Sequence, residues 1–156
     1  MSVLTSHEWL EAMVDAFEET ATSMMGFETV IKGTFYDSVP ERWAGSWLAL
    51  VGTGDQAQIG IAGDRPTCDG LARALLGFEP DEDMSDDDLV DAMSEIVNVV
   101  AGGLKTRIAE RQPGLSLGLP VFFKGQPRLT PQLECAVAEV TLGEFVPSLL
   151  VLRPSK

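Results

Sequence analysis

The first element predicted from the hydrophobic pattern is an amphipathic helix near the start of the chain. Apolar and small side chains recur every three or four residues from about Ser6 to Met25, which is the spacing of one helix face. Thr5 and Glu8 form a capping box at its start, and Gly26 follows as a stop signal. The face predicted to be buried consists of Trp9, Met13, Ala16, Phe17, Thr20 and Met24.

Two further helices are predicted downstream, separated by an acidic connector. The shorter helix spans Thr67 to Leu76 and is closed by Gly77. The longer helix spans about Asp86 to Glu110, and Ser85 is its predicted N-cap. The side of the longer helix that is predicted to be buried is broad and apolar: Leu89, Met93, Ile96, Val97, Val100, Leu104 and Ile108.

The remaining segments have the alternating pattern of strands, predicted over residues 27–36, 45–51, 58–62, 115–123, 133–142 and 145–152. Gly52 to Asp55 favours a hairpin turn, because a phosphate-binding loop would need a helix directly after it. Pro147 cannot donate a hydrogen bond, so the last strand is predicted at a sheet edge or at a bulge rather than at the centre of the sheet. The pattern predicts one α+β domain over residues 1–156: an antiparallel sheet with the longest helix and the N-terminal helix packed on one side.

The charge balance limits the partners of the chain. Its 156 residues include 24 acidic and 11 basic side chains, a net charge of −13. So acidic a chain lacks the cations to neutralise phosphates, and we expect neither nucleic acid nor a membrane as a partner. Lys105, Arg107 and Arg111 form the densest basic group, which we interpret as a solvated helix end. With no secretory signal and no apolar run of about 20 residues, a soluble, reduced, cytoplasmic protein is expected.

The usual metal and nucleophile signals are weak. Cys68 and Cys135 are far apart in the sequence, and His7 is the single histidine, so no ordinary zinc site or catalytic triad is expected. The acidic connector, residues 79–83, lacks the glycine and the terminal glutamate of a calcium loop. No metal ligand is therefore assigned in this chain.

A polar stripe on the longest predicted helix is the main functional candidate. Helix residues advance about 100° each, so positions 91, 95, 98 and 102 fall within an arc of roughly 60°, opposite the apolar face. Asn98, the only asparagine, offers a donor and an acceptor without a charge that would repel a phosphoryl group. A glycine such as Gly102 makes a helix about 1 kcal/mol less stable than alanine would, and the close approach of a partner would explain its presence there. Outward polar residues are also ordinary on helix surfaces, so the stripe alone leaves both interpretations open. The stripe consists of Asp91, Glu95, Asn98 and Gly102.

The pattern Asp91-x-x-x-Glu95-x-x-Asn98, with Pro120 further along the chain, resembles the signature of the CheC/CheX/FliY family of bacterial chemotaxis phosphatases. The resemblance covers about residues 44–125 and is closest to CheX-like domains. Segments 45–50, 58–61 and 71–77 are similar to two central strands and a short helix of that fold. Two positions depart from the pattern: Ser94, where many relatives have glycine, and Gly103, where asparagine is frequent. Substrate fit could differ at these two positions.

This resemblance implies a phosphatase that hydrolyses the aspartyl phosphate of a CheY-type receiver domain. It implies that Asn98 positions the attacking water and that Glu95 contacts a lysine of the receiver, while Asp91 and Gly102 lie in the partner-binding surface. The Mg²⁺ ion would belong to the receiver, so no cofactor is expected in this chain. Such roles are physically reasonable, because phosphoryl transfer requires positioning and charge stabilisation.

Other interpretations stay open at this stage. A non-catalytic adaptor of the same fold would bind the receiver and regulate by occupancy, although the intact Glu95 and Asn98 pair favours the phosphatase. A flagellar-switch component would favour additional docking segments. The similarity to CheX and the apolar strand at residues 145–152 together predict a homodimer.

The first predicted helix carries an echo of the polar stripe. The run from Glu11 to Asp15 is similar to the run from Asp91 to Glu95, but Glu18 then takes the place of Asn98. A carboxylate there would repel phosphoryl oxygens, so we predict that this helix is inert.

Overall fold

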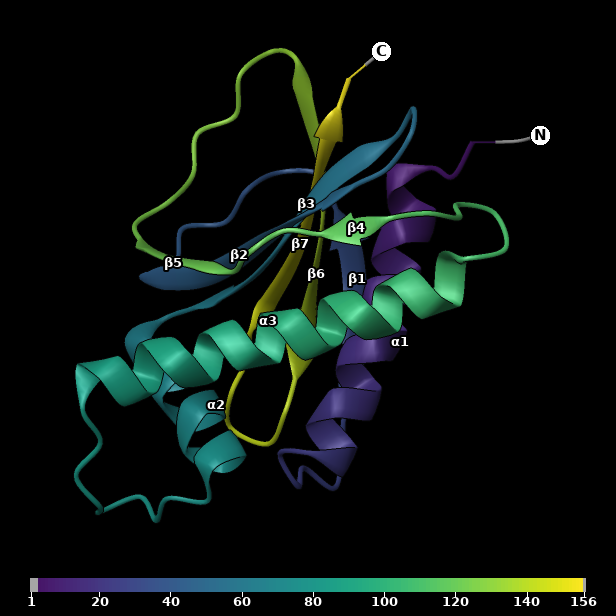
Figure 1. Ribbon diagram of the computed structural model, residues 1–156. Coiled ribbons are helices and arrows are strands. Elements are labelled where there is room, and N and C mark those ends of the chain that lie inside the picture. The colour runs from purple at the N-terminus through teal and green to yellow at the C-terminus, as the bar shows by residue number, and fades with distance from the viewer. Residues whose placement is uncertain (1–2, 156) are drawn as a thin grey trace.

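The computed structural model describes residues 3–155, which form one antiparallel sheet with three helices on one face (Figure 1). The helices are α1 (Ser6–Ser23), α2 (Arg65–Leu76) and α3 (Asp86–Ile108). The strands are β1 (Ile31–Tyr36), β2 (Ala44–Val51), β3 (Gln56–Gly63), β4 (Ser116–Leu117), β5 (Val121–Lys124), β6 (Leu133–Thr141) and β7 (Ser148–Pro154). The strand order is β1-β6-β7-β3-β2-β4, and β5 also pairs with β2. The predicted fold class is confirmed.

The N-terminus of α1 is fixed by the predicted capping box. The Thr5 hydroxyl accepts a hydrogen bond from the Glu8 backbone at 3.0 Å, and the Glu8 carboxylate accepts one from the Thr5 backbone at 3.0 Å. The predicted inner face is buried except for Met24, which is 43% exposed. The helix ends at Ser23, so Met24 lies past its last regular turn.

The longest helix, α3, is anchored by a fully buried apolar side. The Ser85 hydroxyl caps it by accepting a hydrogen bond from the Asp88 backbone at 3.1 Å. Each of the seven residues predicted for its apolar face is buried. In Figure 1, α3 runs across the sheet, with α2 beneath its N-terminal half and α1 beside its C-terminal half. The opposite side of α3 therefore faces outward.

The sheet separates a large core from a smaller one. Because side chains alternate along a strand, one face carries Leu48, Ile59 and Val151 into the core shared with the helices. The other face carries none of the helices that the structure describes. Val39 and Leu129, from segments between strands, cover part of a smaller apolar cluster on this face. The cluster consists of Trp47, Ala62, Cys135, Val137, Leu150 and Leu152.

The prediction of an edge strand at residues 145–152 is wrong. The strand β7 lies between β6 and β3 and pairs with both. Its unbroken apolar run reflects burial on both faces of the sheet, which is typical of a central strand. Pro147 precedes β7, is buried, and accepts a hydrogen bond from the Val140 backbone at 3.1 Å, so its missing N–H interrupts no ladder.

The edges of the sheet are instead β1 on one side and the β4–β5 segment on the other. The single strand predicted over residues 115–123 is divided in two. Leu117 pairs with Leu50, whereas Val121 pairs with Trp47, so the register shifts by one residue across the intervening segment 118–120. The Gly118 backbone bridges the break by donating to the Ala49 carbonyl at 2.7 Å.

Candidate functional site

The structure brings the predicted polar stripe together on the outward side of α3. Asp91, Glu95 and Asn98 are exposed and Gly102 is half-buried, while the neighbouring Ile96 is fully buried. Within residues 3–155, none of the three polar side chains has a hydrogen-bond or ion-pair partner. Their carboxylate and amide groups are therefore accessible to another molecule, on a helix whose other side is held by the core.

The two adjacent glycines of α3 have different surroundings. A Cβ atom added to Gly102 would meet nothing within 4 Å. A Cβ atom added to Gly103 would lie 3.1 Å from the Cβ of Ala16, because α1 packs closely there. Helix packing therefore accounts for Gly103 but not for Gly102.

Ion pairs fasten the end of α3 and the residues just after it to α1. The Arg107 guanidinium pairs with the Glu19 carboxylate, and Arg111 pairs with Glu8. These two arginines, interpreted from the sequence as a solvated helix end, are therefore partly engaged within the protein. Lys105, the third member of that basic group, is exposed on the same side of α3 as Asn98.

The echo of the stripe on α1 is engaged in internal contacts. The Lys32 ammonium lies 2.8 Å from an Asp15 carboxylate oxygen and 3.1 Å from a Glu18 carboxylate oxygen. The hydrogen bond to Asp15, followed by the one to Glu18, raises the pKa of Lys32 above its usual value. This face of α1 therefore presents two carboxylates that share one ammonium group, and it has no amide at the position of Glu18.

Pro120, the last element of the sequence pattern, does not lie on α3. It is half-buried in the break between β4 and β5, beside Leu119, which is 87% exposed. Val121 and Phe123 on the same edge are also exposed, at 46% and 57%. The sheet edge near Pro120 thus displays apolar side chains.

The other chemically notable side chains form no alternative centre in the described residues. Burial, with a smaller effect from the Asp64 carboxylate, raises the pKa of the Cys68 thiol to about 12, which keeps it protonated and poorly nucleophilic near neutral pH. His7 lies on the surface of α1, 3.1 Å from Glu11. No group of three His, Cys, Asp or Glu residues within positions 3–155 is placed to hold a metal ion.

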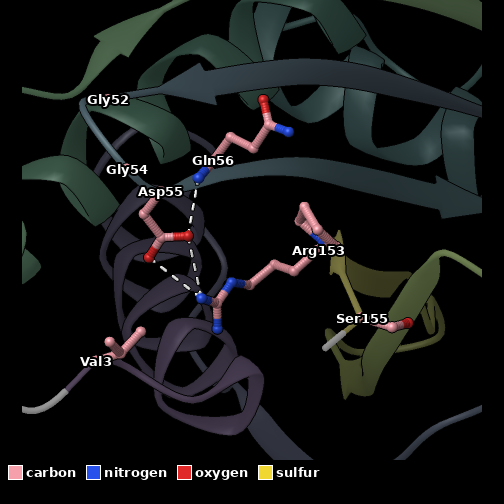
Figure 2. Close-up of a pocket in the computed structure, with 8 residues that line it drawn as sticks. Val3, Gly52, Gly54, Asp55, Gln56, Arg153 and Ser155 are labelled. Carbon is pink, nitrogen blue, oxygen red and sulfur yellow. Dashed lines mark hydrogen bonds and ion pairs between the residues drawn. The ribbon is translucent and has the colours of Figure 1, made fainter.

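A cavity of about 460 Å³ lies away from α3, between the β2–β3 turn, the end of β7 and the N-terminal segment (Figure 2). Both carboxylate oxygens of Asp55 accept hydrogen bonds from Arg153 at 3.1 Å. Arg153 also donates to the Leu4 carbonyl at 2.7 Å, and its guanidinium lies 5.4 Å from the centre of the Trp9 ring. Asp55 and Arg153 pair with one another, so the cluster joins three parts of the chain, while the buried Arg153 Nε and Trp9 Nε1 have no hydrogen-bond partner among the described residues. Among the described helices, none is long and apolar enough to cross a membrane.

Solved structures share this arrangement of sheet and helices. A chemotaxis protein CheX from Desulfovibrio desulfuricans matches with a TM-score of 0.81 at 16% identity, over 94% of this chain and 99% of that one. A structure described as the CheX–CheY–BeF₃–Mg²⁺ complex from Borrelia burgdorferi matches with a TM-score of 0.79 at 17% identity, over 95% and 98%. FliY from Thermotoga maritima matches with a TM-score of 0.67 at 12% identity, over 99% and 93%. At such identities the likeness shows the fold.

These neighbours define the fold as the one shared by the CheX and FliY structures. The family model described as chemotaxis phosphatase CheX matches residues 44–141, which is more than half of the chain. The chain belongs to this family. The search of curated proteins finds no match for the chain.

Proposed function

We propose that this protein is a phosphatase that accelerates hydrolysis of the aspartyl phosphate on a CheY-type receiver domain. The observation that carries the proposal is the set of unengaged polar groups on the outward side of α3, in a chain of the CheX family. The description of the Borrelia burgdorferi structure as a complex with CheY supports a receiver as the partner.

In the proposed reaction the α3 helix enters the phosphorylation site of the receiver. The Asn98 amide holds a water molecule in line with the phosphorus atom. The water oxygen forms the new bond to phosphorus while the bond to the aspartate oxygen breaks. The aspartate is restored as a carboxylate, and inorganic phosphate leaves with the protons of the water. A neutral amide suits this position, because a carboxylate would repel the phosphoryl oxygens.

The other stripe residues have docking roles in this proposal. Glu95 pairs with a lysine of the receiver, which holds Asn98 in register with the phosphoryl group. Asp91 lies one turn closer to the N-terminus and extends the polar contact surface. Gly102 lets the receiver backbone approach α3, since a Cβ atom there would occupy open space. The Mg²⁺ ion is bound by the receiver and offsets the charge that develops during transfer.

The test of catalysis is phosphate release from a phosphorylated receiver encoded beside the gene for this protein. We expect Asn98→Ala to keep its fold and nearly all of its receiver affinity, because the side chain faces outward. Its turnover should fall roughly 10²–10³-fold, the scale for losing one pre-organised polar group. Glu95→Ala should weaken both binding and turnover, because an ion pair with the receiver acts before and during the reaction. Removing Mg²⁺ with a chelator should abolish the reaction through the receiver.

One result would favour the adaptor function instead of catalysis. If the wild-type protein binds the receiver but releases phosphate no faster than the receiver alone, regulation by occupancy is the better account. An Asn98→Ala variant with wild-type turnover would also contradict the proposed role of that amide.

We also propose that the protein forms a homodimer, on a basis that differs from the sequence prediction. The exposed apolar side chains of the β4–β5 edge, Val121 and Phe123, replace the central strand β7 as the expected contact. An unpaired edge with apolar side chains favours pairing with a second chain.

A further inference from the structure

We propose that Lys105 is a docking residue of α3, which pairs with a carboxylate on the receiver surface beside the phosphorylation site. This inference rests on the proposed function, since it takes a receiver as the partner of the polar stripe. The sequence alone did not distinguish Lys105 from Arg107 and Arg111, the other members of the basic group.

The geometry of α3 places Lys105 in line with the stripe. Seven residues separate Asn98 from Lys105, which corresponds to nearly two full turns, an angular offset of about 20° and a rise of about 10 Å. Helical side chains lean toward the N-terminus, so the Lys105 stem is directed over the turn that contains Gly102. Gly102 has no side chain to obstruct it. A partner seated on Asn98 and Gly102 would therefore meet Lys105 at the next turn.

Lys105 is unusual in this chain because nothing within residues 3–155 pairs with it. Ten of the eleven lysines and arginines lie within residues 3–155, the exception being Lys156. In that part of the chain only Lys105 and Arg128 have no ion-pair, hydrogen-bond or aromatic partner. Two of the other eight, Arg65 and Lys124, lie over the Trp43 ring. The remaining six pair with carboxylates: Lys32, Arg42, Arg73, Arg107, Arg111 and Arg153.

The local sequence leaves this lysine unpaired despite the 24 acidic residues of the chain. Helical ion pairs form between residues three or four positions apart. Those positions around Lys105 hold Ala101, Gly102, Ile108 and Ala109, and none is acidic. By contrast, Arg107 reaches Glu19 on α1. An accessible, unpaired cation therefore points outward from an otherwise acidic helix face.

Charge complementarity identifies the group that Lys105 would meet. The proposed partner carries an aspartyl phosphate and the carboxylates that hold Mg²⁺, while the stripe itself contributes Asp91 and Glu95. Two acidic surfaces repel one another, and a cation at the contact offsets that repulsion and speeds encounter. Because Asn98 occupies the phosphoryl position about 10 Å away, the partner of Lys105 is a receiver carboxylate outside the phosphoryl group.

The experiment measures association and dissociation rates between the purified protein and the receiver encoded beside its gene. The receiver is used both unmodified and held with beryllofluoride and Mg²⁺. Lys105→Ala should lower the association rate with both forms roughly threefold at about 50 mM salt, and the difference should shrink at about 500 mM salt. Lys105→Arg should restore the rate. Arg128→Ala, which removes the same charge from the exposed segment between β5 and β6, should bind as the wild type does.

Each outcome separates this inference from the proposed function. If Lys105→Ala matches Arg128→Ala while the wild type binds the receiver, Lys105 has no docking role and the proposed function stands. If the effect is confined to the beryllofluoride form, the contact is to the phosphoryl group and the carboxylate assignment is wrong. If the wild type binds neither form, the receiver is not the partner, and both proposals fall.

Discussion

The contrast between Gly102 and Gly103 on α3 shows at the residue scale how a helix can keep two glycines for different reasons. Gly103 is explained within the molecule, because Ala16 of α1 lies 3.1 Å from the place where a Cβ would be. Gly102 lies in open space and carries the cost of glycine in a helix without any internal compensation. Sequence reasoning marked Gly102 as a partner-approach site, but the difference from Gly103 is a fact of packing.

The substitution Gly102→Ala tests this difference directly. We expect it to raise the free energy of unfolding by about 1 kcal/mol, because alanine is the better helix former and meets no neighbour. Receiver affinity should fall roughly tenfold if the receiver backbone contacts α3 at this point, the scale of an overpacked contact. Thermal denaturation and receiver titration give the two values.

Gly103→Ala is the matched control for that pair of measurements. It makes the same change one residue along, but the gain in helix propensity is opposed by the contact with Ala16. It should stabilise the protein less than Gly102→Ala and leave receiver affinity unchanged. A Gly102→Ala variant that binds as tightly as the wild type would remove Gly102 from the docking surface.

At the scale of whole elements, α1 and α3 are two amphipathic helices that share one short run of similar sequence and have different outward faces. The face of α3 that carries Asn98 has no internal partner in the described residues. The corresponding carboxylates of α1 hold the Lys32 ammonium, which comes from the neighbouring strand β1. The capping residues and buried sides of both helices could be predicted from local spacing. The contact with Lys32 could not, because it joins residues distant in the sequence.

The substitution Glu18→Ala tests whether α1 is inert. Asp15 would still pair with Lys32, and an exposed ion pair contributes at most about 1 kcal/mol, so the variant should remain folded. Phosphate release from the receiver should stay within about twofold of the wild type, in contrast to the loss expected of Asn98→Ala. A folded Glu18→Ala protein that had lost most of its activity would place a second functional surface on α1.

At the scale of the whole molecule, the order of strands determines which apolar surface is available for association. The apolar residues of β7 are covered on both faces, so they stabilise the monomer. The apolar side chains of the β4–β5 edge are exposed, and the β1 edge on the opposite side carries an irregular register, which discourages pairing.

Light scattering at tens of micromolar, a range suited to weak interfaces, should therefore report a dimer. Phe123→Glu should shift the mass to that of a monomer, because a charge at a paired apolar edge is costly to bury. Ile31→Glu makes the same kind of change on the exposed β1 edge and should leave the dimer intact. A monomeric wild-type protein, or dissociation by Ile31→Glu alone, would contradict the proposed interface.

The sequence by itself determined the features that depend on near neighbours along the chain. Helix periodicity placed the apolar side of α3 in the core and the polar stripe opposite it, and capping chemistry fixed the starts of α1 and α3. These features follow from the regular 3.6-residue turn and from hydrogen bonds within three or four residues. The family pattern on α3 could be identified for the same reason.

Only the tertiary structure decided the features that depend on strand order and on contacts across the chain. An apolar strand that contains or follows a proline can lie at the edge of a sheet or at its centre, where both faces are buried. In this protein β7 is central because it pairs with both β6 and β3. Likewise, the sequence grouped Lys105 with Arg107 and Arg111, and the carboxylates of α1 bind the two arginines while leaving the lysine outward. Long-range packing determines which neighbours a side chain meets, and local spacing carries no information about them.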